Sequence, residues 1–218
     1  MRCSFARKSW WILSGIALAH SAWAAVVPTV ATFSADEDDF IGSTIATVQI
    51  YSGGGGNPGG HVEIRKDFGP GIDIIGTQNS VWPEFLGDYA AAGVTGGGFD
   101  LNVFETPFDS AQLRMRRNVG ENGWYFEFGP IVPNGGLWAS YDVAFDPTWS
   151  DALALGNGWQ QEAGSPSFAD LMSSVGWLEV RLFNLGSAVA GVDNVRLVPE
   201  PSALVLVLAG LVALSRRR

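Results

Sequence analysis

The chain has 218 residues, a formal net charge of −9 and one cysteine, Cys3. With one cysteine and two histidines, an intramolecular disulfide framework and a zinc site built from several Cys or His ligands are both excluded. The acidic balance also argues against nucleic acid as a partner, because a negative surface repels phosphate backbones.

The N-terminal segment has the organisation of a secretory signal peptide. A positive start, an apolar stretch and a small-residue cleavage site follow one another at Arg2, Arg7 and Lys8, then 10–19, then 22–24. This order predicts a signal peptide over 1–24, cleaved after Ala24. The alternative is a short N-terminal anchor or a buried helix. Because Cys3 lies in the leader, we expect the exported chain to contain no cysteine.

Alternation of apolar and polar residues recurs along the middle of the chain and predicts β-strands. Val62 and Ile64, for example, face one way, whereas His61 and Glu63 face the other. The alternating stretches are 44–51, 61–67, 99–103, 111–117, 124–128 and 137–145. Gly, Pro, Asn and Asp separate them, and this pattern is typical of an all-β sandwich.

A glycine-rich segment, 53–60, lies between the first two of these strands. Glycine loops bind phosphate when a helix with a Lys-Ser/Thr pair follows, but here a strand follows and no such pair is present. A tight loop between strands is therefore the favoured interpretation.

One segment departs from the strand pattern. Ser165 is placed to cap a helix, Pro166 suits its first position, and the apolar residues of 168–175 share one helical face. Strands are predicted again at 177–183 and 191–198. The sequence therefore predicts a single short helix packed on a sandwich that spans 25–198, enough residues for one domain with a sizeable core.

Two stretches of this domain resemble the laminin B-type domain. Residues 55–63 read GGNPGGHVE and residues 85–89 read FLGDY, and the helix and strands at 168–197 follow in the matching order. The resemblance implies a jelly-roll β-sandwich akin to galactose-binding and carbohydrate-binding modules.

The same resemblance implies a structural Ca²⁺ ion between the first strand and the last. Asp36 or Asp38, from the acidic run 36–39, would then lie near Asp193. Carboxylates and loop carbonyls are the oxygen ligands that Ca²⁺ takes. A solvated acidic turn without a metal is the alternative.

Aromatic rings beside polar side chains suggest a sugar-binding surface. Six tryptophans lie between the two ends of the chain, and of these Trp124 and Trp177 are expected in the core. Trp138 shares a strand face with Asp142 and is the candidate for sugar contact, with a position in the core as the alternative. The predicted concave site comprises Trp138, Asp142, Tyr125, Glu127, Arg114 and Arg116.

Catalysis has less support. His61 is the only histidine outside the leader, it is expected at the surface, and no nucleophile-elbow pattern accompanies it. Paired carboxylates that hydrolyse a glycosidic bond remain an alternative. Candidates for such a pair are Glu63, Glu105, Glu127 and Asp142.

The last twenty residues resemble the PEP-CTERM sorting signal of Gram-negative bacteria. They contain a proline motif, an apolar run and a basic end: Pro199, Glu200 and Pro201, then 203–214, then Arg216, Arg217 and Arg218. The prolines break the chain before a new helix. The resemblance implies transient insertion of this helix into the inner membrane and cleavage by the membrane protease exosortase.

These features predict three segments: a signal peptide at 1–24, the sandwich at 25–198 and the sorting signal at 199–218. Between 25 and 201, seven Lys and Arg face 22 Asp and Glu, a net charge of −15. The expected protein is exported to the cell surface or the extracellular matrix. There it binds polysaccharide without catalysis or acts structurally. The alternative is a secreted glycan-active hydrolase.

Overall fold

The computed structural model describes residues 25–44, 47–66, 74–184 and 186–199. The predicted signal peptide and all of the predicted sorting signal except Pro199 lie outside these residues. Within the described part of the chain, no helix is long and apolar enough to cross a membrane.

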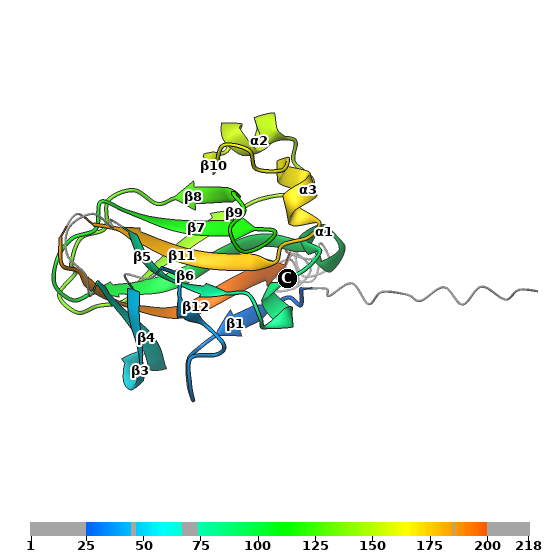
Figure 1. Ribbon diagram of the computed structural model, residues 1–218. Helices are drawn as coiled ribbons and strands as arrows, with labels where there is room; N and C mark the ends of the chain where they lie inside the picture. The colour runs from blue at the N-terminus through cyan, green and yellow to red at the C-terminus, as the bar shows by residue number, and fades with distance from the viewer. Residues whose placement is uncertain (1–24, 45–46, 67–73, 185, 200–218) are drawn as a thin grey trace, which may run out of the picture.

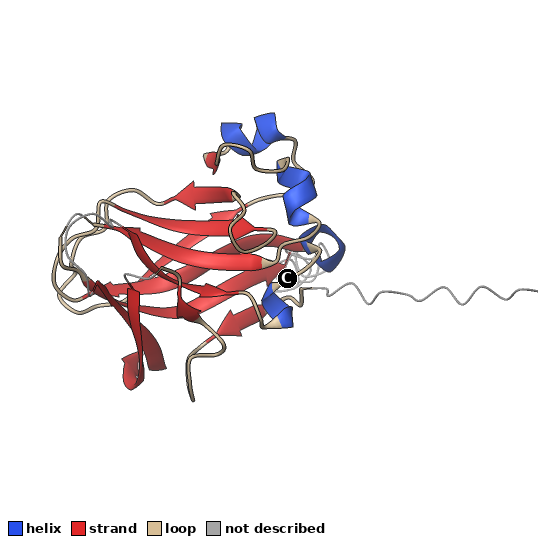
Figure 2. Cartoon of the chain, viewed as in Figure 1, coloured by secondary structure: helices blue, strands red, loops and turns tan. Residues whose placement is uncertain are grey.

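Two antiparallel sheets form a sandwich (Figures 1 and 2). We name the first sheet A; its strands, in spatial order, are β3 (Thr47–Gly56), β4 (Gly59–Lys66), β12 (Val189–Pro199), β6 (Val94–Val103) and β9 (Ala139–Ala144), with β1 (Thr29–Ala31) paired to β12. We name the second sheet B; its order is β10 (Trp159–Gln161), β8 (Trp124–Glu127), β7 (Ser110–Arg116), β11 (Trp177–Phe183), β5 (Ile74–Asn79) and β2 (Ile41–Gly42). The all-β sandwich predicted from the alternation is confirmed.

The prediction of a single helix is wrong. Besides α3 (Phe168–Met172), the described residues form α1 (Tyr89–Ala92), α2 (Asp151–Gly156) and the 3₁₀ turn η1 (Pro83–Phe85). The carboxylate of Asp88 caps α1, and the hydroxyl of Ser150 caps α2. These helices are too short to show an apolar periodicity, so only their caps mark them in the sequence.

Alternation along the strands decides what enters the core. Leu113 and Met115 on β7 are fully buried between the sheets, as are Val62 and Ile64 on β4. At the end where α2 and α3 lie, core rings meet edge to face, with Trp124 and Phe168 centred 5.2 Å apart. Trp124 is a core residue, as predicted.

A β-bulge in β12 sets which of its residues face outward. Asp193 pairs with Asp100 and Arg196 pairs with Gly98, so two residues of β12 oppose one residue of β6. Asn194, in the bulge, has a φ of 47°. Because the extra residue shifts the alternation by one position, Asp193 and Arg196 lie on the same outer side of sheet A.

Candidate functional site

The residues predicted to share one binding site are divided between the two sheets. Trp138 and Asp142 lie just before and on β9, in sheet A, whereas Arg114 and Arg116 lie on β7, in sheet B. Tyr125 and Glu127 lie on β8, also in sheet B, and complete the second group. All six are on the side of their strand that faces away from the core. The prediction of a single concave site is therefore wrong, because the two groups lie on opposite faces of the sandwich.

Strand register arranges the outward side of sheet B, which we call the sheet B face. Arg114 on β7 lies opposite Tyr125 on β8 and opposite Glu179 on β11. Two residues further along β7, Arg116 lies opposite Trp177. Side chains directly opposite on neighbouring strands have Cβ atoms about 5 Å apart, so these groups are in contact range.

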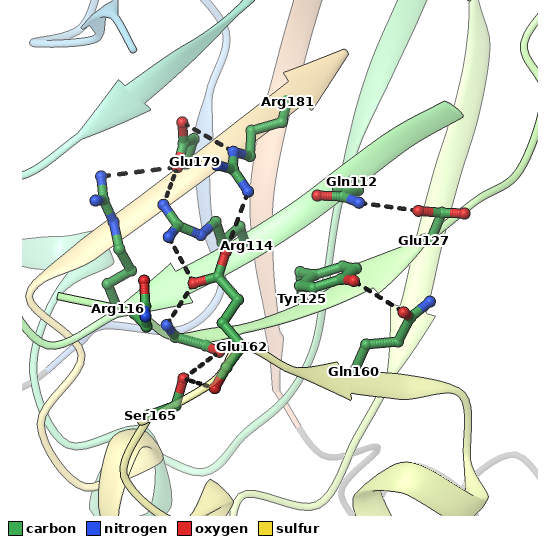
Figure 3. Close-up of polar contacts among 12 residues, drawn as sticks. Gln112, Arg114, Arg116, Tyr125, Glu127, Gln160, Glu162, Ser165, Glu179 and Arg181 are labelled. Carbon is green, nitrogen blue, oxygen red and sulfur yellow. Dashed lines mark hydrogen bonds and ion pairs between the residues drawn. The ribbon is translucent and has the colours of Figure 1, made fainter. Parts of the chain in front are cut away.

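Three guanidinium groups on this face share two carboxylates (Figure 3). Arg114 lies between them, with Nη1 at 2.9 Å from Glu179 Oε2 and Nη2 at 2.6 Å from Glu162 Oε2. Arg181 lies 3.3 Å from Glu162 and 3.4 Å from Glu179. Within the described part of the chain, Arg116 has one carboxylate contact, 3.7 Å to Glu179.

Glu162 reaches the network from the segment after β10. Its carboxylate accepts a 2.6 Å hydrogen bond from the Gly123 N–H, and its own N–H donates to the Gly123 carbonyl at 3.0 Å. A Cβ at position 123 would collide with the Met115 carbonyl oxygen of β7. Glycine at this position therefore lets the chain approach β7 closely enough to hold Glu162 over the sheet.

The network is buried although it lies on an outer face. The side chain of Glu179 is 2% exposed. Burial by itself raises the pKa of Glu162, but hydrogen bonds from Arg114 and the Gly123 N–H outweigh it, and the pKa is lowered overall. Burial and the neighbouring Arg114 both lower the pKa of Arg116. The charged groups of this network are held in fixed positions by their mutual contacts.

Tyr125, which is half-buried, and Gln112, which is buried, continue the sheet B face beyond the ion-pair network. The Tyr125 hydroxyl donates to Gln160 Oε1 at 2.8 Å, and Gln112 Nε2 donates to Glu127 Oε2 at 2.9 Å (Figure 3). Several buried polar atoms of this face have no hydrogen-bond partner among the described residues: Gln78 Oε1, Gln112 Oε1, Arg114 Nε, Arg116 Nε and Trp177 Nε1. Leaving buried polar atoms of this kind without partners is costly in free energy.

Trp177 is buried as predicted, but on the outer side of sheet B and not in the core between the sheets. It is 8% exposed and lies on the outer side of β11, where the guanidinium of Arg116 stacks over its ring at 4.0 Å. Alternation along 177–183 also puts Glu179 and Arg181 on this side, a signal that the sequence analysis did not use. Glu162 has no such local signal, because its position depends on Gly123, far away in the sequence.

On the outer side of sheet A, Trp138 covers a glycine. A Cβ on Gly191 would lie 2.8 Å from the Trp138 ring, 2.9 Å from His61 and 3.1 Å from Phe104. The indole N–H of Trp138 donates to the Gly55 carbonyl at 2.9 Å. Its ring is therefore fixed by packing. His61 was expected at the surface but is 5% exposed, because the rings of Phe104 and Trp138 pack against it.

Asp142, the second predicted residue on this side, is engaged in an ion pair. Its Oδ1 lies 2.6 Å from Arg196 Nη2, and Arg196 Nη1 lies 2.9 Å from Asp100. Hydrogen bonds from Ser140, Asn194 and Arg196 outweigh the effect of burial and lower the pKa of Asp100. On this side of sheet A, Arg196 is thus shared by two carboxylates, which leaves one negative charge in excess among these three side chains.

The residues predicted to bind calcium lie near the turn between β3 and β4. Asp193 accepts hydrogen bonds from the Asn57 N–H at 2.5 Å and the Asn194 N–H at 2.7 Å, and Asp38 accepts from the Phe33 N–H at 2.8 Å. Burial raises the pKa of Asp193, and the nearby charges of Asp100 and Asp38 raise it further. The structure therefore brings Asp38 close enough to Asp193 for their charges to interact.

These carboxylates fit the oxygen chemistry of calcium only in part. Burial raises the pKa of Asp38 as well, so a cation would stabilise both ionised groups. However, the described residues contain no group of three or more His, Cys, Asp or Glu side chains arranged to hold a metal ion. Most of the six to eight oxygens would have to be carbonyls or water. Asp36 instead lines a neighbouring hollow and accepts from the Asp38 N–H at 2.9 Å.

No family model matches the sequence, and no curated protein matches it. The structure resembles a family 11 carbohydrate-binding module from Clostridium thermocellum, solved with a β-1,3-1,4-mixed-linked tetrasaccharide. The TM-score is 0.53 with 12% identity over 81% of this chain and 98% of the module. It also resembles an exo-β-agarase, with a TM-score of 0.56 and 12% identity over 80% of this chain and 25% of that one. The chain thus spans about a quarter of the agarase. These likenesses establish the fold as a jelly-roll β-sandwich of the kind found in carbohydrate-binding modules.

Proposed function

We propose that this protein is an exported, non-catalytic β-sandwich that binds polysaccharide on the sheet B face. The observation that carries the proposal is the buried group of charged and amide side chains on an outer sheet surface, several of whose polar atoms lack a partner among the described residues. Sugar hydroxyls are donors and acceptors, so they would satisfy such atoms. The ring of Tyr125, half-buried beside them, offers an apolar surface for a sugar ring.

The positions of the carboxylates disfavour hydrolysis. Glycosidases hold two carboxyl groups about 5–10 Å apart, whereas Glu127 and Asp142 lie on opposite faces. Glu63 and Asp142 share sheet A but are three strand spacings apart, roughly 14 Å. Glu162 and Glu179 are close to each other, but each is ion-paired with arginines, and the lowered pKa of Glu162 makes it a poor proton donor.

Binding and turnover assays separate the two functions. We expect polysaccharides immobilised in a native gel to retard the protein, and no reducing sugar to be released in the same mixtures. Tyr125→Ala should weaken binding about tenfold or more, the scale of a central aromatic contact. Trp149→Ala, outside the sheet B face, controls for the loss of a ring. Release of sugar, or retardation that is unchanged in Tyr125→Ala, would contradict the proposal.

We further propose that the C-terminal segment is an exosortase sorting signal that follows directly on the domain. The support is the order of proline motif, apolar run and arginines after β12, whose last residue is Pro199. Localising the full-length chain against a version that ends at Val198 tests this. Identical secretion and retention of the two versions would refute the sorting role.

Finally, we propose a calcium ion at Asp38 and Asp193, where it would hold the turn between β3 and β4 against β12. The support is the proximity of one half-buried carboxylate, Asp38, and one buried carboxylate, Asp193, whose pKa values are both raised. Chelation tests the proposal, as developed below.

A further inference from the structure

We propose that the sheet B face selects acidic polysaccharides, and that an anionic group on the sugar, a uronate carboxylate or a sulfate ester, binds at Arg116 beside Trp177. This inference rests on the proposed glycan-binding function and specifies its ligand class.

The sheet B face concentrates the few cations of an acidic protein. Only seven Lys and Arg lie between residues 25 and 201, against 22 Asp and Glu. Arg114, Arg116 and Arg181 gather on this one face, where their ion pairs with described residues involve Glu162 and Glu179. Among the described residues, three positive charges against two negative ones leave an excess of one cation in this buried network. Buried charges are costly unless they are paired, so this site favours an added anion.

Arg116 is the guanidinium that lacks a close partner. Its 3.7 Å contact with Glu179 is longer than every ion-pair contact of Arg114 and Arg181 in this network, which measure 2.6–3.4 Å. The residue is only 9% exposed, and its Nε atom has no hydrogen-bond partner among the described residues. The nearby Glu179 carboxylate is already engaged at 2.9 Å by Arg114. Of the three guanidinium groups, Arg116 is therefore the one that lacks a close hydrogen-bond acceptor among the described residues.

Trp177 orients this guanidinium and adds a second donor. The Arg116 guanidinium lies 4.0 Å from the centre of the Trp177 ring, a cation–π contact that fixes its plane. The indole N–H of Trp177 also lacks a partner in the described part of the chain. Arg116 covers one face of the ring and Trp177 is only 8% exposed, so little of the ring surface is available for a neutral sugar to stack on.

A planar or multi-oxygen anion matches these donors better than a hydroxyl does. Guanidinium groups bind carboxylates through two parallel hydrogen bonds, and such charge-assisted bonds are about twice as strong as neutral ones. A hydroxyl would accept one bond but would leave the excess charge uncompensated. The negative Glu127 lies on the far side of the face, opposite Gln112, four residues along β7 from Arg116 and so roughly 13 Å away. The anionic group is therefore expected at the Arg116 end, with neutral parts of the chain near Tyr125.

Matched polysaccharides test the inference. The probes are a polyuronate with its carboxyl-reduced form, and a sulfated galactan with its desulfated form, each compared by affinity electrophoresis and calorimetry. We expect at least one charged member to bind about tenfold or more tightly than its neutral counterpart, and this preference to weaken as salt screens the charges. The pair that shows the preference identifies the anion.

Variants locate the effect. Arg116→Gln should remove most of the preference for the charged member, and Arg116→Lys should keep part of it. Arg65→Gln is the matched control: it changes the net charge equally but lies on sheet A, 45% exposed and paired with Glu63. Circular dichroism checks the fold of each variant. If Arg116→Gln does not fold, the partial preference of Arg116→Lys carries the test.

Two results would overturn the inference while leaving the proposed function standing. One is equal binding of the charged and neutral members of both pairs. The other is an equal loss of preference in Arg65→Gln and Arg116→Gln. Failure to bind any polysaccharide would instead refute the proposed function, and the inference with it.

Discussion

Replacement of Glu179 by glutamine tests whether the buried charges of the sheet B face form one interdependent network. The carboxylate of Glu179 is 2% exposed and contacts Arg114 at 2.9 Å, Arg181 at 3.4 Å and Arg116 at 3.7 Å. The substitution preserves the shape of the side chain but leaves three guanidinium groups with the single carboxylate of Glu162.

The expected loss of stability is large for one side chain. Unit charges about 4 Å apart attract by about 4 kcal/mol at an effective dielectric constant of about 20, and removing one partner of a buried ion pair typically costs about 3–5 kcal/mol. For a domain of this length, 1 kcal/mol shifts Tm by about 2–4 °C. We therefore expect Glu179→Gln to lower Tm by roughly 6–20 °C.

Urea unfolding followed by tryptophan fluorescence measures the free energy of unfolding directly. Glu127→Gln is the control, because this exposed carboxylate pairs only with an amide, and its loss should cost less than about 0.5 kcal/mol. The double variant Arg114→Met/Glu179→Leu removes a charge of each sign, so it should be more stable than Glu179→Gln. Equal unfolding free energies for Glu179→Gln and Glu127→Gln would refute the idea of a buried network.

Three further predictions concern neighbouring features. Gly123→Ala should lower Tm and weaken glycan binding, because the added methyl group collides with β7 and displaces Glu162. Gly156→Ala is the control: a Cβ added at position 156 has no atom within 4 Å, so Tm and glycan binding should stay unchanged. If calcium binds, chelation should lower the free energy of unfolding of the wild type by about 2.7 kcal/mol, the contribution of an ion at a hundredfold excess over Kd, and Tm should fall accordingly. The Tm of Asp193→Asn should not change on chelation. An unchanged Tm of the wild type would exclude the ion. Because the pKa of Glu162 is lowered in the folded state, its stabilising contribution is complete above its unfolded pKa of about 4.3 and lost as pH falls through its folded pKa. The Tm difference between wild type and Glu162→Gln should therefore shrink from pH 7 to pH 3, and a constant difference would contradict this.

Local patterns in the sequence predicted most of the strands and their faces. The strand at 177–183 was predicted with its observed bounds, and the helix predicted from the Ser-Pro segment was found at 168–172. Short elements without alternation were missed, among them β5, β10 and α2. Their stability comes from tertiary contacts, such as the pairing of β5 with β11 along six residues, and not from a local period.

Strand alternation predicted only part of the candidate site. Alternation correctly put Trp138 and Asp142 on one side of their strand, and Arg114 on the outer side of its own. It did not reveal that β9 belongs to sheet A and β7 to sheet B, nor that Glu162 lies over β7. The alternation of apolar and polar residues along a strand specifies which side chains face the core, because successive side chains point to opposite sides of the sheet. Which sheet a strand joins, and which charges then meet, depends on hydrogen bonds between residues far apart in the chain, and only the tertiary structure decided these.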